Sequence, residues 1–141
     1  MATATSTAHT WATKVSVPGL PALPADAPAV ILGDYAVEVE TPVNPGTVSL
    51  EIDVGAITKA KVVSLVINAD QTAMDVYTNA ADGTGGQHFA LQANKSVAWN
   101  NTTFDQTQFP NPISSTTITK FFLNNSSAKP GVFRAAFLLV V

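Results

Sequence analysis

The feature that most constrains this chain is a series of short apolar runs, each ended by turn residues. From Asp34 onward, runs rich in Val, Ile, Leu and Phe are divided by clusters of Gly, Pro and Asn. Such runs are typical of β-strands, and no amphipathic helix of useful length lies between them. The pattern predicts strands at Tyr35–Glu40, Val48–Val54, Lys61–Ile67, Met74–Thr78, His88–Leu91, Ser96–Trp99, Thr117–Leu123 and Val132–Val141.

About eight short strands separated by turns favour an all-β fold, a jelly-roll-like two-sheet β-sandwich. The 141 residues fit one domain with a substantial core. The turn residues Asn44-Pro45-Gly46 separate the first two alternating runs. We therefore predict that these two runs form a β-hairpin.

Residues 1–30 differ in composition from the rest of the chain. They are rich in Thr, Ala, Ser and Pro, and four prolines between positions 18 and 28 disfavour helix and strand pairing. We predict an extended arm over residues 1–30 and a β-sandwich domain over residues 31–141. The arm either docks on a neighbouring subunit or folds back over its own domain. Its candidate docking residues are Trp11, Val15, Val17, Leu20 and Leu23.

Charged residues are scarce, at 12% of the chain against about 25% in a typical soluble domain. The polar surface must therefore consist largely of Thr, Ser, Asn and Gln. Such a surface costs less to desolvate than a charged one, which favours burial in an assembly. The alternative is a weakly charged exterior that has no partner.

Other bulk properties exclude several classes of function. The net charge is -3 and the seven Lys and Arg residues are scattered, which argues against nucleic-acid binding. The absence of cysteine excludes disulfides, thiolate chemistry and Cys-ligated zinc. We expect no secretory signal, no membrane span and no cofactor.

Four carboxylates lie at alternating positions of the two runs that form the expected hairpin. If the valines between them face the core, all four acids share the opposite side of the hairpin. Such a patch requires solvent, a cation such as calcium or a basic partner, because like charges across a ladder repel. We favour solvent over a cation site for these residues, which are Glu38, Glu40, Glu51 and Asp53.

Two further features are candidates for a catalytic or a phosphate-binding element. His88 is the only candidate base in the core domain, and an enzymatic role requires an acid and a nucleophile beside it. The loop Asp82-Gly-Thr-Gly-Gly86 lacks the full dinucleotide or P-loop fingerprint. We expect no catalytic residue and interpret the glycines as a hairpin loop.

Three aromatic residues, Trp99, Phe104 and Phe109, frame a long polar loop that runs from Asn100 to Ser115. Aromatic rings in this position either plug into the core and anchor the loop or form a platform on which a sugar stacks. In the second case Asp82 would supply a polar contact. The platform is the basis of an alternative function, a carbohydrate- or receptor-binding module.

The second half of the chain contains the strand series His88–Leu91, Val97–Trp99, Thr117–Asn125 and Val132–Leu139. In this series the chain resembles small β-sandwich virion proteins of tailed bacteriophages, especially head decoration or cement proteins. The resemblance implies a homo-oligomer, with a trimer favoured, on the outer capsid surface of a virion. It also implies the major capsid protein or other shell subunits as partners. It transfers no specific binding residue to this chain.

Overall fold

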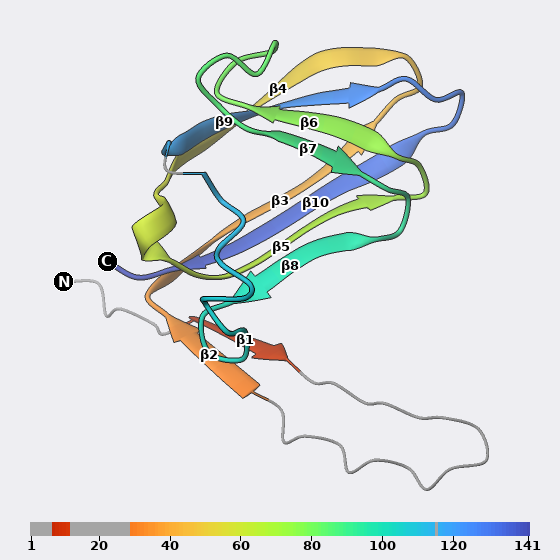
Figure 1. Cartoon of the computed structure of the whole chain (residues 1–141). Helices are drawn as coiled ribbons and strands as arrows, with labels where there is room; N and C mark the ends of the chain where they lie inside the picture. The colour runs from red at the N-terminus through yellow and green to blue at the C-terminus, as the bar shows by residue number, and fades with distance from the viewer. Residues whose placement is uncertain (1–6, 12–28, 115) are drawn as a thin grey trace, which may run out of the picture.

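A computed structural model describes residues 7–11, 29–114 and 116–141. Within these ranges the chain forms ten β-strands and a short 3-10 helix at Lys59–Lys61. Two four-stranded antiparallel sheets pack face to face, and a two-stranded ribbon extends from one end (Figure 1). The strands are β1 Thr7–Trp11, β2 Ala29–Gly33, β3 Tyr35–Val43, β4 Thr47–Ile57, β5 Val62–Asp70, β6 Met74–Thr78, β7 His88–Leu91, β8 Ser96–Asn100, β9 Ile118–Asn125 and β10 Gly131–Leu139.

The order of the strands is that of a jelly roll. One sheet has the order β3-β10-β5-β8, and the other has the order β4-β9-β6-β7. From β3 to β10 the chain crosses to the opposite sheet at every connection except the β6–β7 hairpin. Two Greek keys interleaved in this way define the eight-stranded jelly roll. The predicted all-β, jelly-roll-like sandwich is therefore confirmed.

The predicted hairpin between the two acidic strands is wrong. β3 pairs with β10 and β4 pairs with β9, so the two strands lie in opposite sheets. Asn125 fixes the connection between β3 and β4 through two hydrogen bonds. Its side-chain amide donates to the Val43 carbonyl at 3.1 Å, and its backbone carbonyl accepts from the Gly46 amide at 2.8 Å. The turn residues signal a reversal of the chain, but they do not specify which strand becomes the partner.

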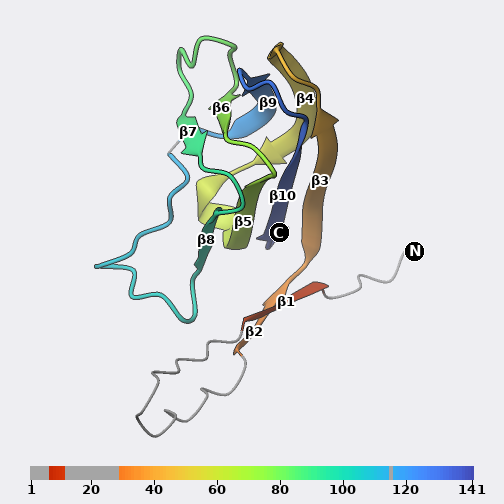
Figure 2. The same cartoon turned by 90° about the vertical axis from the view of Figure 1, so that its right-hand side faces the viewer.

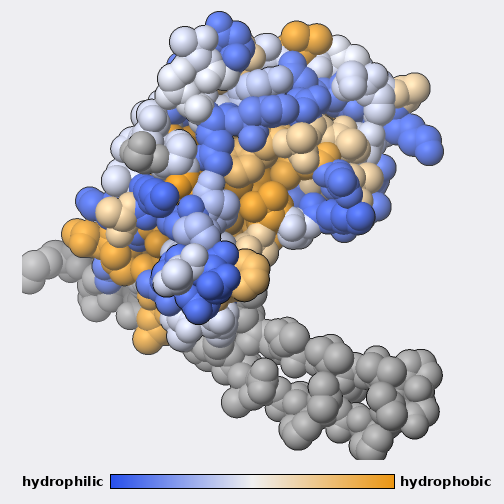
Figure 3. Space-filling view, viewed as in Figure 1, coloured by the Kyte–Doolittle hydropathy of each residue, from blue (hydrophilic) through white to orange (hydrophobic). Residues whose placement is uncertain are grey.

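The core lies between the inner faces of the two sheets. Its centre is an aromatic cluster in which Phe121 of β9 contacts Phe133 and Phe137 of β10, with ring centroids 5.5 and 6.1 Å apart. All three rings are fully buried, and each contributes on the order of 2 kcal/mol from burial alone. Figure 3 shows apolar residues in the gap between the sheets on the side of β7 and β8, where the core side chains Phe89, Leu91 and Trp99 are buried.

Two consecutive leucines of β10 lie in separate clusters, because successive side chains of a strand point to opposite faces of the sheet. The pairing register with β5 shifts between Leu138 and Leu139, and both side chains are fully buried. Leu139 belongs to the central core, whereas Leu138 packs with Ile31 and Val63 on the outer face of the sheet. The register skips Val63, so the bulge lies in β5 and brings Val63 to the outer face beside Leu138, where Ile31 of β2 packs against both.

The ribbon of β1 and β2 contacts the sandwich at its base. Ile31 is 2% exposed, and a Cβ atom at Gly33 would lie 2.5 Å from Cγ of Leu138, so the β2 backbone lies directly on that side chain. Leu32, on the opposite side of β2, is 63% exposed. Figure 2 shows the ribbon outside the sandwich, where β2 leads into β3.

Candidate functional site

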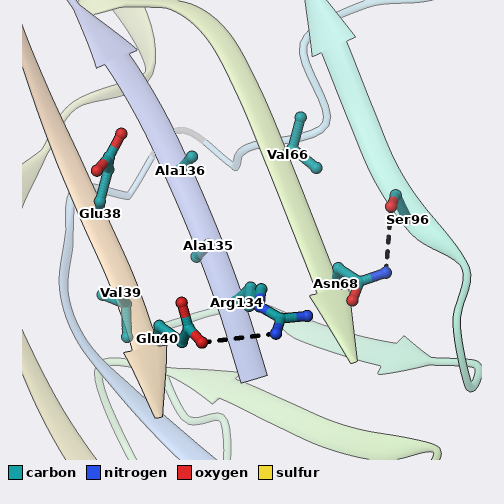
Figure 4. A pocket seen from close by; sticks show the side chains of 9 residues that line it. All are labelled: Glu38, Val39, Glu40, Val66, Asn68, Ser96, Arg134, Ala135 and Ala136. Carbon is teal, nitrogen blue, oxygen red and sulfur yellow. Dashed lines mark hydrogen bonds and ion pairs between the residues drawn. The ribbon is translucent and has the colours of Figure 1, made fainter. Parts of the chain in front are cut away.

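The outer face of the β3-β10-β5-β8 sheet contains a shallow hollow of about 570 Å³. Pairing places outward-facing side chains of the four strands in rows, so that Ala136 of β10 lies between Glu38 of β3 and Val66 of β5. Small side chains at the centre of this row form the floor of the hollow, and longer polar residues line one end (Figure 4).

Arg134 stands at the polar end of the hollow. Its guanidinium pairs with Asp70 on β5, and Nη2 lies 3.5 Å from a carboxylate oxygen of Glu40 on β3. The hydrogen bond with Asp70, followed by the charge of Glu40, raises the pKa of Arg134 above its ordinary value despite partial desolvation. The guanidinium therefore stays charged at any physiological pH and is shared between two carboxylates.

Glu38 differs from Glu40 in its surroundings. It is exposed and forms no ion pair with any residue in the described ranges. Next to Arg134, the Asn68 side-chain amide donates to the hydroxyl of Ser96 at 3.2 Å. The hollow thus has an unpaired carboxylate at one side, a neutral amide-hydroxyl pair at the other, and an apolar floor between them.

The four acids predicted to share one patch are divided between the two outer faces. Glu51 lies on β4 and accepts a hydrogen bond from the ammonium group of Lys120, and this hydrogen bond raises the pKa of Lys120. An Asp53 carboxylate oxygen accepts from the Gly55 amide at 2.9 Å, across a bulge in the same strand. In the described part of the chain no three acidic or His side chains are grouped so that they could hold a metal ion.

The structure does not bring Trp99, Phe104 and Phe109 to one exposed surface. Trp99 is 4% exposed and packs into the core. Phe104 is half-buried and meets Phe109 edge to face at 6.2 Å. Only Phe109, at 61% exposure, offers a ring to a ligand. The geometry is that of an anchored loop.

His88 lies on the outer face of the other sheet, beside an acid. Its Nε2 is 2.7 Å from a carboxylate oxygen of Asp75, and its ring stacks on Tyr77 at 4.4 Å. The described residues provide no hydrogen bond between this imidazole and a Ser or Thr hydroxyl. Within the described ranges His88 thus has an acid beside it and no hydrogen-bonded hydroxyl.

Asp82 is used within its own loop. Its carboxylate accepts from the Thr84 amide at 2.9 Å, and this hydrogen bond holds the pKa of Asp82 below its ordinary value of 3.8. Gly83 and Gly85 have positive φ angles of 78° and 71°, which glycine adopts without strain. The loop is a tight turn built around the carboxylate.

The predicted docking arm falls mostly beyond the described ranges. Val15, Val17, Leu20 and Leu23 lie outside them, and of Trp11 only the backbone is described, as the end of β1. Conversely, Arg134, Asp70 and Asn68 lie on one surface that was not predicted from the sequence. Arg134 interrupts a long apolar run, and this single charge was the available signal for an outward-facing position.

A comparison with protein-family models found no match, and neither the curated proteins nor the solved structures contain a significant match to this chain. Within the described ranges, no helix is long and apolar enough to cross a membrane.

Proposed function

We propose that the protein is a non-enzymatic structural subunit of a virion, a capsid decoration or cement protein that stabilises a shell by bridging its subunits. The observation that carries this proposal is the β1–β2 ribbon, which lies outside the sandwich and is seated on it at its base. An isolated two-stranded ribbon is only marginally stable in water. A neighbouring subunit that covers the ribbon would supply the missing burial.

The attachment of the ribbon supports a role in bridging. Asp34, between β2 and β3, donates its amide to the Leu139 carbonyl at 2.8 Å and accepts from the Val141 amide at 2.7 Å. Ile31 adds apolar contact with Leu138. The base of the ribbon is therefore fixed on the sandwich, while the exposed Leu32 is available to a partner.

The surface chemistry supports assembly in a second way. The outer face of the β3-β10-β5-β8 sheet has an apolar floor of Ala and Val side chains, and its single Arg is neutralised by carboxylates. Burying such a face removes from water one cluster of paired charges and one carboxylate, Glu38, whose charge a cation on the partner would neutralise. The jelly roll itself occurs in viral capsid proteins, but also in lectins and cupins, so the fold supports the proposal only by analogy.

The test is binding of the purified chain to shells assembled from the major capsid protein encoded in the same genome. We expect stoichiometric, regularly repeated copies on the outer surface by electron cryomicroscopy, together with a higher melting temperature of the shell. Absence of binding to such shells would contradict the proposal.

A truncated chain provides the matched variant. Deletion of residues 1–30 removes β1 and part of β2 but keeps all eight sandwich strands and Ile31. We expect a folded domain that binds shells more weakly than the full chain. If the truncated chain does not fold, residues 1–30 belong to the core and the bridging role is wrong.

A further inference from the structure

We infer that the free edge of β3 accepts an added strand from a second copy of this chain, namely residues 13–17. The inference deepens the proposed assembly function and rests on it. Among the strands that the structure describes, β3 pairs only with β10, in a register that is continuous from Tyr35 to Val43. Its other side is an edge of the sheet (Figure 2). An edge strand presents unpaired backbone groups to which another strand can bind.

The other edges of the sandwich are poorer templates. β4 is longer than β3, but its register shifts twice, and Ser49 and Gly55 have positive φ angles of 54° and 77°. Bulges of this kind twist an edge and block pairing. β7 and β8 have only 4 and 5 residues. Among the edges of the two described four-stranded sheets, β3 is the long and regular one.

The side chains of β3 define what an added strand must carry. Val37 and Val39 point inward and are only half-buried, because no strand lies beyond them. Glu38 and Glu40 alternate with them on the outer face and are exposed. Residues opposite each other in neighbouring strands point to the same face. The added strand therefore needs apolar residues on one face and a cation on the other.

Residues 13–17 of the chain have this alternation. They read Thr-Lys-Val-Ser-Val, with Lys14 on one face and Val15 and Val17 on the other, and Pro18 follows. Lys14 is the only Lys or Arg before Lys59. If the two valines pair antiparallel with Val37 and Val39, Lys14 lies opposite Glu40 and diagonal to Glu38, which has no described ion pair.

The pairing of the ribbon favours a second copy over the same chain. Thr7 of β1 pairs with Gly33, next to the sandwich, whereas Trp11 pairs with Ala29. The chain therefore leaves β1 at the far end of the ribbon, four residues or about 13 Å from Gly33. Pairing of two β3 edges with each other is disfavoured, because Glu38 and Glu40 would face the same carboxylates in the partner.

Charge reversal in the full chain tests the inference through self-association, measured by analytical ultracentrifugation. We expect the wild type to self-associate, and Lys14→Glu to weaken association about tenfold or more. The double variant Glu38→Lys/Glu40→Lys should have a similar effect, and a mixture of the two variants should restore association. The charge-matched control is Lys129→Glu, in the β9–β10 loop, which should associate like the wild type.

Cysteine pairing gives an independent readout, because the chain contains no cysteine. A chain with Lys14→Cys, mixed with a chain carrying Glu38→Cys or Glu40→Cys, should form a disulfide-linked pair of different polypeptides under mild oxidation. A mixture with Glu51→Cys, on the opposite outer face, should not. A third sample is a single chain that carries Lys14→Cys and Glu38→Cys together. If the disulfide forms only within that chain and never between two chains, the inference is overturned.

The same experiments separate this inference from the proposed function. A wild type that stays monomeric at every concentration, or charge reversals without effect, would overturn strand addition between copies. Neither result concerns binding to shells, which is measured separately. If the chain does not bind shells but still self-associates in a way that depends on Lys14, the capsid role is contradicted. The contact between copies would then still be supported.

Discussion

The indole N–H of Trp99 donates a hydrogen bond to the backbone carbonyl of Phe109 at 3.0 Å. Trp99 is at the end of β8 and is buried in the core, whereas the Phe109 side chain is exposed in the long loop between β8 and β9. One ring thus fills core volume and fixes the loop at a point ten residues further along the chain. Loop and core are coupled through this side chain.

Substitution of Trp99 separates its two roles. We expect Trp99→Phe to lose the hydrogen bond at a cost of about 1 kcal/mol in addition to a small packing loss. Trp99→Ala should cost about 3 to 5 kcal/mol because it also leaves a cavity. Denaturant unfolding measures both. The control is Phe109→Ala, which keeps the carbonyl acceptor and removes an exposed ring, and an equal loss in all three variants would contradict this account.

Gly33→Ala should detach the ribbon without unfolding the sandwich. The new Cβ would lie 2.5 Å from Cγ of Leu138 and 2.9 Å from the Leu139 carbonyl, so β2 must move. Amide hydrogen exchange should become faster in β2 and remain slow in β5 and β10. Gly46→Ala is the control for a strained but distant substitution: its Cβ meets no neighbour within 4 Å, so its cost comes from the positive φ of 75° beyond the opposite end of β3, and exchange in β2 should stay unchanged. Unchanged exchange in β2 would contradict the seating of the ribbon.

Asp82 should stabilise the glycine loop in a pH-dependent way. Its folded pKa lies below the ordinary value of 3.8, because the carboxylate accepts a hydrogen bond from Thr84. Its contribution is therefore present above pH 3.8 and is lost as the pH falls through the lower, folded pKa. Thermal unfolding of wild type and Asp82→Ala should differ slightly at neutral pH and converge in strong acid. A difference that persists in acid would show that the charge is not the cause.

Chelation should leave the melting temperature unchanged. The acids of β3 and β4 lie on opposite outer faces, and Glu40 and Glu51 are already paired with Arg134 and Lys120. A cation that bound only the folded chain would raise its stability by mass action. Differential scanning calorimetry with and without chelator measures this. A fall of several degrees on adding chelator would reveal a cation site.

The positions of the strands were largely predictable from the sequence. Met74–Thr78 and His88–Leu91 match β6 and β7 to the residue. Alternation and turn residues mark such elements locally, because each strand must bury one face. The two-sheet class followed from the number of strands. The bulge at Val63 in β5 was not predictable, because it inserts no unusual residue into an apolar run.

The arrangement of the outer face could not be predicted. Arg134, Asp70 and Glu40 are far apart in sequence and meet because β10 lies between β3 and β5. Local patterns identify which residues face outward but not which strands are neighbours. The same limitation caused the false hairpin, since the turn at Asn44–Gly46 leads to the opposite sheet.

The central place of β10 also governs how the chain acquires its structure. Tyr35 pairs with Leu139 and Val43 pairs with Gly131, so the β3–β10 ladder joins segments about a hundred residues apart in sequence. During synthesis, β3 and β5 cannot pair with β10, the strand between them, until residues 131–139 have left the ribosome. Such non-local pairing makes folding slow, on the order of milliseconds to seconds. Nascent chains stalled before Gly131 should therefore remain sensitive to protease and dependent on chaperones.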